Sequence, residues 1–330
     1  MILICYGTRP EYLKIKPLLS KMKGVLPFKT LFTGQHLDLV NETSDYRIEI
    51  TDERNRLDSI VSSIMNSFDF KKYGITRVLV QGDTTTSFAI ALSAFNHQIP
   101  IVHLEAGLRT YDLNHPYPEE GNRQMISCIA TTHLCPTELS KNVLSTRGTS
   151  GIVEVVGNTV LDNLVDVKCS NEKRVLLTLH RRENHARMKE WFQEIERLSI
   201  KYFDYEFILP LHPNPAVKEH VNILERVKVV NPLCYDDLIK YLSSCAFVIT
   251  DSGGIQEEAS FLRKRCLVCR EQTERTEGLN NFSLLCENPS LLFQRVEELK
   301  ELKMEGNCPY GDGRSSERIV KILTSMEENR

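Results

Sequence analysis

Three carboxylates stand among basic side chains within one stretch of the sequence, residues 78–123. Asp83 follows an apolar run that is typical of a buried strand, and Glu105 follows a second run of the same kind. Glu119 lies in the loop that we expect after Glu105. The same loop carries further ionisable residues: Arg109, His115, Glu120 and Arg123. Carboxylates held close to one another and to cations have shifted pKa values, as proton transfer requires. The alternative is that these acids only cap helices or neutralise the arginines.

Two strands and a helix must position these acids. The runs at 78–81 and 99–104 are continuously apolar rather than alternating, which favours parallel strands covered on both faces. The residues between them have the apolar spacing of a helix. Because a strand–helix–strand crossover is right-handed, the C-terminal ends of the two strands lie side by side. We therefore expect Asp83 and Glu105 to share one crevice.

A second candidate site is the segment DSGGIQEE at 251–258, which follows a predicted strand and opens a predicted helix. The backbone N–H groups at Ser252 and Gly253 and the helix dipole favour an anion, such as a diphosphate. Glu258 then stands roughly 9 Å along the helix from Ser252, where it could accept hydrogen bonds from a ribose. The alternative for Glu258 is a solvent-exposed carboxylate. Neither a GxGxxG nor a Walker sequence occurs, so NAD and ATP are not expected.

Further polar residues lie at the ends of other predicted strands or at the start of the helix that follows. They are Arg9, Lys14, His180, His212, Arg270 and Arg275. Ligands bind at the carboxyl ends of the strands in open parallel sheets, and arginine suits phosphate. Together these residues predict a ligand-binding edge, although each one alone could be a surface charge or a structural histidine.

Strands and helices alternate along both halves of the chain. This pattern predicts an α/β fold of two Rossmann-like domains with an interdomain cleft. We place the N-terminal domain at 1–167, the C-terminal, nucleotide-binding domain at 168–313, and a last amphipathic helix at 314–330. A helix that runs into a polar link is also expected over 162–173.

Composition excludes several classes of protein. The chain has 330 residues, 26% of them charged, and a formal net charge of −3, so neither nucleic acid nor a membrane surface is an expected partner. It has no apolar run of about 20 residues and no signal-peptide pattern, which predicts a cytoplasmic protein. We expect its ten cysteines to be free thiols. Cys266 and Cys269 form a CxxC pair in a predicted strand, but without a second pair they do not predict a zinc site.

A series of motifs along nearly the whole chain resembles the non-hydrolysing UDP-N-acetylglucosamine 2-epimerase family. The motifs are GTRPE at 7–11, TGQH at 33–36, GDTTT at 82–86, HLEAGLRT at 103–110, PYPEEGNR at 116–123, GNTVLD at 157–162, HRREN at 180–184, HPNP at 212–215, DSGGIQEE at 251–258, TER at 273–275 and CPYGDG at 308–313.

The resemblance implies a fold and a reaction. The family has the two-domain GT-B fold, is usually dimeric, and packs its last helix back onto the first domain. It interconverts UDP-GlcNAc and UDP-ManNAc without a metal or redox cofactor, by elimination of UDP to 2-acetamidoglucal and re-addition. We therefore expect a homodimer with a UDP-acetamido sugar and UDP as ligands.

The resemblance also implies roles for individual residues. The catalytic set would be Asp83, Glu105, Glu119 and His180. The substrate-binding set would be Arg9, Lys14, Arg123, His212, Ser252, Gly253, Glu258 and Arg275. Proton removal at C2 needs bases on both faces of the sugar, and Asp83 and Glu119 are the candidates, assisted by Glu105 and His180.

Departures from the family pattern leave room for other substrates. Leu37 and Asp38 stand where the family commonly has basic or amide residues that contact an allosteric UDP-GlcNAc. Thr276 replaces a usual proline, and Arg263 and Arg265 replace a glycine and a proline. The alternatives are a C2 epimerase of a 6-deoxy or L-configured UDP-acetamido sugar, a hydrolysing epimerase that releases ManNAc, a glycosyltransferase of the same fold, and a UDP-sugar sensor.

Overall fold

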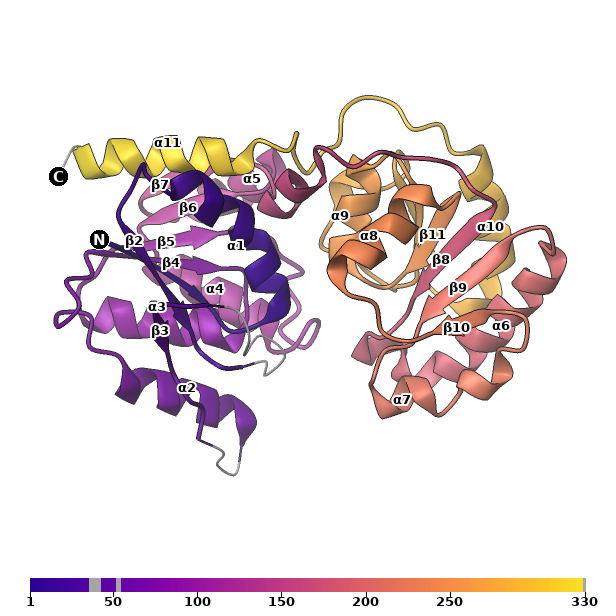
Figure 1. The fold of residues 1–330 in the computed structure, drawn as a ribbon, viewed down its shortest axis with the longest axis horizontal. Coiled ribbons are helices and arrows are strands. Elements are labelled where there is room, and N and C mark those ends of the chain that lie inside the picture. Colours follow the sequence, from indigo (N-terminus) through magenta and orange to yellow (C-terminus); the bar gives the residue numbers. More distant parts are fainter. Residues whose placement is uncertain (36–42, 52–54, 329–330) are drawn as a thin grey trace. The chain divides into compact units, whose positions relative to one another are not determined.

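The computed structural model describes residues 1–35, 43–51 and 55–328. The chain forms two compact units (Figure 1). Unit 1 comprises Met1–Asn163 and Gly311–Arg330, and unit 2 comprises Leu164–Tyr310. Each unit is built on one sheet whose strands are all paired in parallel, so the predicted α/β architecture of two Rossmann-like sheets is confirmed.

The sheet of unit 1 has seven strands in the order β3-β2-β1-β4-β5-β6-β7. In chain order they are β1 (Ile2–Tyr6), β2 (Phe28–Phe32), β3 (Tyr46–Arg47), β4 (Arg77–Gln81), β5 (Ile101–Leu104), β6 (Thr132–Cys135) and β7 (Ile152–Val155). The central strands β1, β4 and β5 are mostly apolar and are buried at every position except Arg77, because helices cover both faces of the sheet.

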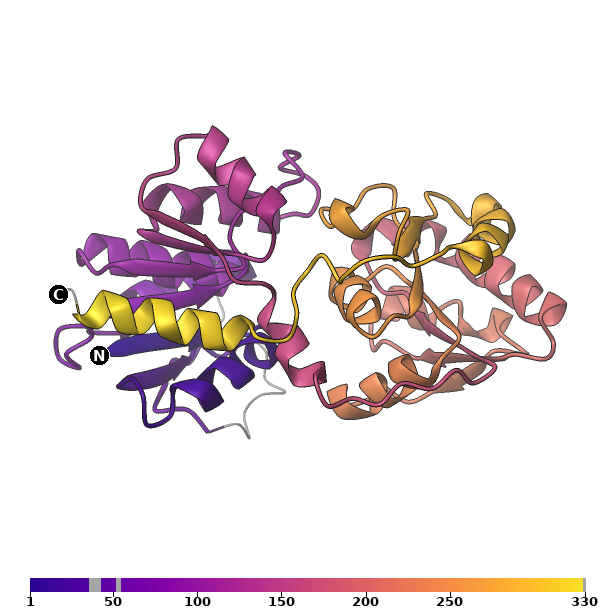
Figure 2. The same ribbon diagram turned by 90° about the horizontal axis from the view of Figure 1, so that it is seen from above.

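The helices of unit 1 divide between the two faces of this sheet. One face packs against α1 (Arg9–Met22) and α11 (Ser315–Glu328), which lie side by side (Figure 2). The other face packs against α2 (Arg56–Ser67), α3 (Thr85–Asn96) and α4 (Glu119–Ile129), and α5 (Glu138–Thr146) contacts β6 and β7. The last helix of the chain is therefore part of the core of the first unit.

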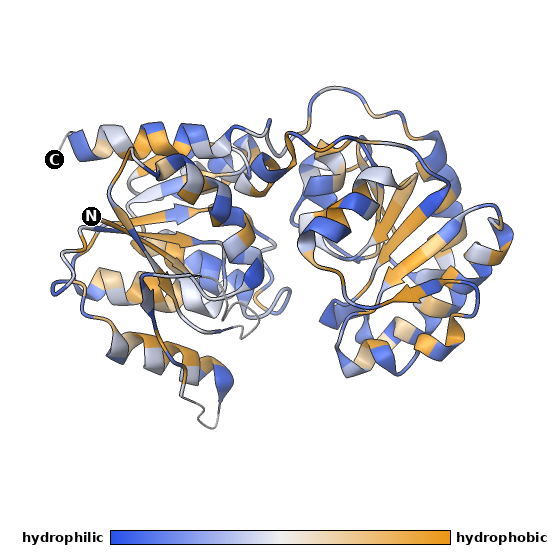
Figure 3. Ribbon diagram, viewed as in Figure 1, coloured by the Kyte–Doolittle hydropathy of each residue, from blue (hydrophilic) through white to orange (hydrophobic). Residues whose placement is uncertain are grey.

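The sheet of unit 2 has six strands in the order β10-β9-β8-β11-β12-β13. Its elements are β8 (Arg174–Thr178), α6 (Met188–Lys201), β9 (Glu206–Pro210), α7 (Pro215–Lys218), β10 (Lys228–Val230), α8 (Tyr235–Ser244), β11 (Phe247–Thr250), α9 (Gly253–Phe261), β12 (Arg265–Val268), β13 (Ser283–Leu285) and α10 (Leu292–Glu301). Helices α6 and α10 pack on one face, around Trp191 and Phe192. Figure 3 shows the apolar strands at the centre of each unit and polar residues on the helices around them.

The helix expected over 162–173 is wrong. A 3-10 helix spans Thr159–Leu164, and the following link has no regular helix. Asp162 instead accepts hydrogen bonds from the backbone N–H groups of Ser315 and Ser316 at 3.0 and 2.7 Å, so it caps α11. The backbone N–H of Ser170 bonds to the carbonyl of Ser243, which holds the link along the end of α8.

Three short strands escaped the sequence analysis. β3, β10 and β13 have two or three residues each and lie at the edges of their sheets. A strand of two or three residues is too short to show the continuous apolar run of a central strand. None of the described helices is long and apolar enough to cross a membrane.

Candidate active site

Two of the three predicted acids, Asp83 and Glu105, lie at the C-terminal ends of two neighbouring strands. Gln81 of β4 pairs with Leu104 of β5, so the turns that begin at Gly82 and Glu105 are adjacent. Gly82 has a φ of +69°, and a Cβ added to it would lie 3.7 Å from Oε2 of Glu105. The Glu105 carboxylate therefore stands over the turn that carries Asp83.

Glu105 is a nearly buried carboxylate with two donors. Nζ of Lys14, from α1, forms an ion pair with its Oε2, and Nε2 of Gln81 donates to the same oxygen. A buried charge needs such compensation. The pair therefore links α1 to the end of β5, and Lys14 neutralises the acid.

Asp83 is the more exposed of the two strand-end carboxylates, with 24% of its side chain accessible. The guanidinium of Arg123, from α4, pairs with Oδ2 of Asp83 and also with Glu120 at 3.4 Å. Nδ2 of Asn122 donates to the backbone carbonyl of Asp83 at 2.9 Å. Helix α4 thus holds both the backbone and the carboxylate of Asp83.

The sequence analysis placed Glu119 in a loop, but the structure shows it as the first residue of α4. A carboxylate there is favoured by the N-terminal end of the helix dipole. Two other residues of the predicted cluster are engaged elsewhere: Arg109 donates to Oγ of Ser127 at 2.7 Å, and the exposed His115 pairs with Asp112 at 2.8 Å. The sequence placed them near the acids because spacing alone does not show such local partners.

Glu11 is a residue of this site that the sequence analysis missed. It is 2% exposed, and its Oε2 accepts from the backbone N–H groups of Gly7 and Thr8 at 2.9 and 2.7 Å. Its Oε1 accepts from the hydroxyls of Thr84 and Ser87 at 2.7 and 2.8 Å. The capping-box spacing of Thr8 and Glu11 was the available signal.

His103 is a second missed residue. It is fully buried in β5, and its Nε2 lies 2.8 Å from the carbonyl oxygen of Gly82. Burial lowers the pKa of His103 to about 3, so the ring is neutral and Nε2 donates its proton to that carbonyl. His103 therefore fixes the turn immediately before Asp83.

The corresponding edge of unit 2 is organised by Asp251, a fully buried carboxylate after β11. It accepts from the backbone N–H groups of His180 and Arg181 at 2.9 and 2.8 Å, and from Nδ2 of Asn184 at 3.0 Å. These contacts hold the HRREN segment at the end of β8. The sequence placed Asp251 in a motif without giving it this function.

His180 and His212 lie together, with ring centroids 4.8 Å apart and planes 13° apart. Nδ1 of His180 is 3.6 Å from Oδ1 of Asp251. Burial lowers the pKa of His180 and the pKa of His212, and the neighbouring His180 lowers the pKa of His212 further. Two stacked neutral rings therefore border this edge of unit 2 at neutral pH.

The start of α9 has the features of an anion site. Ser252 is the N-cap residue, and its side chain makes no cap hydrogen bond to the N–H groups of the first turn. Such N–H groups at the start of a helix can bind an anion. A Cβ added to Gly253 would lie 2.5 Å from Nη1 of Arg275. Any larger residue at this position would require the Arg275 guanidinium to move.

The two arginines that follow β12, Arg270 and Arg275, are buried. Arg275 pairs with Glu257 at 2.5 Å and with Glu274, while Arg270 pairs with Glu183 at 2.7 Å and with Glu274 at 2.9 Å. Their charges are already compensated, because a buried guanidinium requires carboxylates. The Arg275 side chain lies against Gly253 at the start of α9. Motif spacing in the sequence does not predict this tertiary contact.

Glu258 is buried, 4% exposed, and not a solvated helix carboxylate. Oη of Tyr235, the first residue of α8, donates to its Oε1 at 2.9 Å. Tyr235 was also missed, because it is far from Glu258 in sequence.

The departures from the family pattern have structural partners. Arg263 donates to the carbonyls of Gly306 and Met304 at 2.6 and 2.7 Å, and Nε of Arg265 donates to that of Leu302 at 3.0 Å. Both arginines thus hold the chain segment after α10. Thr276 begins a short 3-10 helix, Thr276–Gly278. Leu37 and Asp38, with the allosteric contact they bear on, lie outside the described residues.

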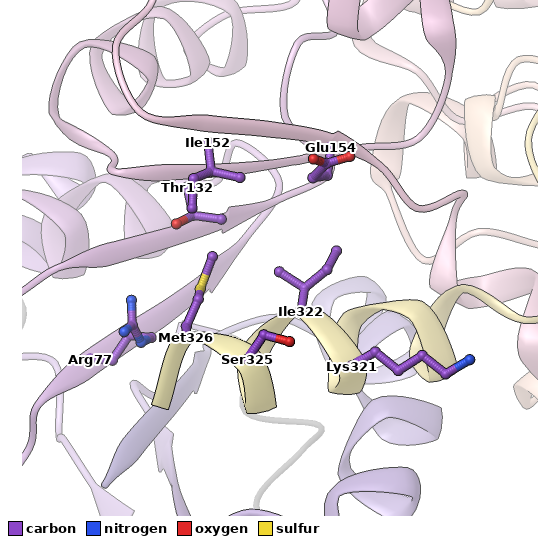
Figure 4. Close-up of a pocket in the computed structure, with 8 residues that line it drawn as sticks. All are labelled: Arg77, Thr132, Ile152, Glu154, Lys321, Ile322, Ser325 and Met326. Atoms are coloured by element: carbon purple, nitrogen blue, oxygen red, sulfur yellow. The ribbon is translucent and has the colours of Figure 1, made fainter. Parts of the chain in front are cut away.

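Two other features lie away from these strand ends. A pocket of about 550 Å³ between α11 and the sheet of unit 1 is lined by Arg77, Thr132, Ile152, Glu154, Lys321, Ile322, Ser325 and Met326 (Figure 4), none of them a predicted site residue. Cys266 and Cys269 are buried in and just after β12, and burial raises the pKa of both thiols. That disfavours the thiolate form that a metal ligand needs.

Comparison with known proteins identifies the family. Residues 22–324 match the family model described as UDP-N-acetylglucosamine 2-epimerase. A UDP-N-acetylglucosamine 2-epimerase from Bacillus subtilis (strain 168) is 37% identical, covering 98% of this chain and 94% of the relative. The crystal structure of UDP-GlcNAc 2-epimerase from Neisseria meningitidis bound to UDP-GlcNAc has a TM-score of 0.88 at 32% identity, covering 98% of this chain and 99% of that one.

A more distant structure has the same fold. The Methanocaldococcus jannaschii UDP-GlcNAc 2-epimerase in complex with UDP-GlcNAc and UDP has a TM-score of 0.82 at 29% identity, covering 98% of this chain and 99% of that one. The family model spans most of the chain, and the matches extend over nearly the full length of each relative. The chain therefore belongs to the UDP-N-acetylglucosamine 2-epimerase family, as its motifs indicated, and it is an enzyme of this kind.

Proposed function

We propose that the enzyme interconverts UDP-GlcNAc and UDP-ManNAc, or a related UDP-2-acetamido sugar, by inversion at C2 without net hydrolysis. The observation that carries this proposal is the pair of carboxylates at neighbouring strand ends, Asp83 and Glu105, each held by a cation from a different helix. Such a pair is suited to moving a proton, since each acid has its own environment.

The proposed reaction has two steps. A carboxylate takes the proton from C2, the C–H electron pair forms the C1=C2 bond of 2-acetamidoglucal, and the C1–O bond breaks so that UDP leaves with its electrons. UDP then adds back to C1 while a proton is delivered to the other face of C2. Asp83 and Glu119 are the proposed bases, with Glu105 and His180 assisting. The two steps together are redox-neutral.

The proposed ligand contacts divide between the two units. In unit 2 the N–H groups at Ser252 and Gly253 bind the diphosphate, which stabilises the charge on the leaving UDP. The remaining binding residues are Arg9, Lys14, Arg123, His212 and Glu258, with Arg275 supporting the start of α9. A homodimer and a cytoplasmic location, which the sequence predicted, are further parts of this proposal.

The test is incubation of the enzyme with UDP-GlcNAc in deuterated water, followed by NMR of the sugar. Deuterium at C2 of an intact UDP-sugar, in both epimers, is the expected result. Free ManNAc with UDP would indicate hydrolysis instead, and an unchanged substrate would contradict epimerisation of UDP-GlcNAc. Repeating the incubation with 6-deoxy and L-configured UDP-acetamido sugars identifies the preferred substrate by its kcat/KM.

A further inference from the structure

The partly buried Tyr235 and the buried Glu258 form a hydrogen-bonded pair at the proposed ligand-binding edge of unit 2. Tyr235 begins α8, which follows the C-terminal end of β10, and Glu258 lies in α9. The phenol Oη donates to Oε1 of Glu258 at 2.9 Å, and 4% of Glu258 is exposed. A buried carboxylate needs hydrogen-bond partners, and Tyr235 is one of those of Glu258.

The position of Glu258 relative to the start of α9 defines what it could reach. It is five residues after Gly253, so it stands about 7.5 Å along the helix axis from the first helical residue. A diphosphate bound at the N–H groups of that first turn would place the next group of a nucleotide, its ribose, at the level of Glu258. The two hydroxyls of a ribose are donors, and a carboxylate is the complementary acceptor.

The phenol of Tyr235 orients this acceptor. Burial and the neighbouring Glu258 raise the pKa of Tyr235 well above its ordinary value, so the phenol remains protonated and remains a donor at every physiological pH. Because Tyr235 is the first residue of α8, its backbone is held by the helix, and the hydrogen bond restricts rotation of the Glu258 carboxylate about its last torsion angle.

We propose that Tyr235 is a positioning residue, which orients Glu258 to recognise the ribose hydroxyls of the nucleotide and so makes the enzyme select ribonucleotides over 2′-deoxyribonucleotides. This inference rests on the proposed binding of UDP by unit 2. It adds a residue from a different helix to the nucleotide site, and it assigns the discrimination between sugars to a pair rather than to Glu258 alone.

The test is calorimetric titration of UDP and 2′-deoxy-UDP into the full-length enzyme and its Tyr235→Phe variant, which keeps the ring and removes the donor. We expect UDP affinity to fall about five- to tenfold, comparable to the net contribution of one ordinary hydrogen bond, and 2′-deoxy-UDP affinity to change less than about twofold. The preference for UDP over 2′-deoxy-UDP therefore shrinks. In a Glu258→Gln background, Tyr235→Phe should shrink it no further.

The matched control is Tyr241→Phe in the same helix, where the ring lies 5.2 Å from the Arg174 guanidinium. This variant should keep both affinities. An equal loss of affinity for both nucleotides in Tyr235→Phe, or no loss for either, would overturn the inference while UDP binding by the wild type stands. A wild type that binds no UDP would instead refute the proposed nucleotide site, and with it this inference.

Discussion

The carboxylate of Glu11 accepts a hydrogen bond from the hydroxyl of Thr84 at 2.7 Å. Glu11 belongs to α1, which also carries Lys14, and Thr84 directly follows Asp83 and caps α3. The contact therefore ties the helix that neutralises Glu105 to the turn that holds Asp83. The positions of Asp83 and Glu105 therefore both depend on the buried carboxylate of Glu11.

Replacing the Glu11 carboxylate with an amide should disturb the contact between α1 and the turn that holds Asp83. In Glu11→Gln the amide nitrogen faces N–H and O–H donors, so one side of the network is lost. We expect turnover to fall about ten- to hundredfold, because hydrogen bonds to charged groups contribute about 1.5–3 kcal/mol each. UDP affinity, measured by calorimetry, should stay within about twofold, since unit 2 carries the proposed UDP contacts. The control is Glu138→Gln in the first turn of α5, which should keep full turnover, and equal effects of the two substitutions would contradict this role.

The start of α9 offers a matched pair of glycines. In Gly253→Ala the new Cβ would lie 2.5 Å from the Arg275 guanidinium, which two carboxylates hold in place. Overpacking of this kind costs about 1–3 kcal/mol, so UDP affinity should fall about tenfold or more. In Gly254→Ala the nearest atom is Oγ of Ser252 at 3.9 Å, an ordinary contact, and affinity should be retained. Calorimetric titration of UDP into both variants checks this. Equal UDP affinities of Gly253→Ala and Gly254→Ala would contradict the importance of the close contact between Gly253 and Arg275.

Variants of the Lys14–Glu105 ion pair allow its effect on stability to be measured separately from its effect on catalysis. Lys14→Met leaves a buried carboxylate without its cation, so the free energy of unfolding in urea should fall by about 3–5 kcal/mol. Adding Glu105→Gln removes the uncompensated charge and should restore much of that stability without restoring turnover. If the double variant were as unstable as Lys14→Met, the uncompensated charge of Glu105 would not be the cause of the instability.

Stability should depend on pH through His103. Its folded-state pKa of about 3 is below the value of about 6.5 for an unfolded histidine, so the unfolded chain binds the extra proton between these values. The contribution is therefore complete above pH 6.5 and is lost progressively as the pH falls towards 3. In His103→Gln, where the amide can still donate to Gly82, the decline in unfolding free energy from pH 7 to pH 5 should be shallower, by up to about 1.4 kcal/mol per pH unit. If the unfolding free energies of the wild type and His103→Gln declined in parallel from pH 7 to pH 5, the low pKa of His103 would be contradicted.

The amino-acid sequence was sufficient for features that are local or periodic. The continuous apolar runs before Asp83 and Glu105 predicted neighbouring parallel strands, and the motifs predicted the family. It was insufficient where side chains from distant segments meet. Arg275 under Gly253 and Tyr235 against Glu258 are joined only by the packing of separate elements, and no spacing rule predicts such contacts. Glu11 is intermediate, because its capping box is visible in the sequence while its bond to Thr84 is not.

The central claim is that the carboxylate of Asp83 moves the proton at C2, and the most direct test compares the wild type with Asp83→Asn. Deuterium incorporation at C2 of UDP-GlcNAc is measured by NMR in deuterated water, and UDP affinity is measured alongside it. We expect incorporation to slow at least about a hundredfold, as for loss of an acid–base group, with UDP affinity retained. Incorporation at the wild-type rate in Asp83→Asn would contradict the claim.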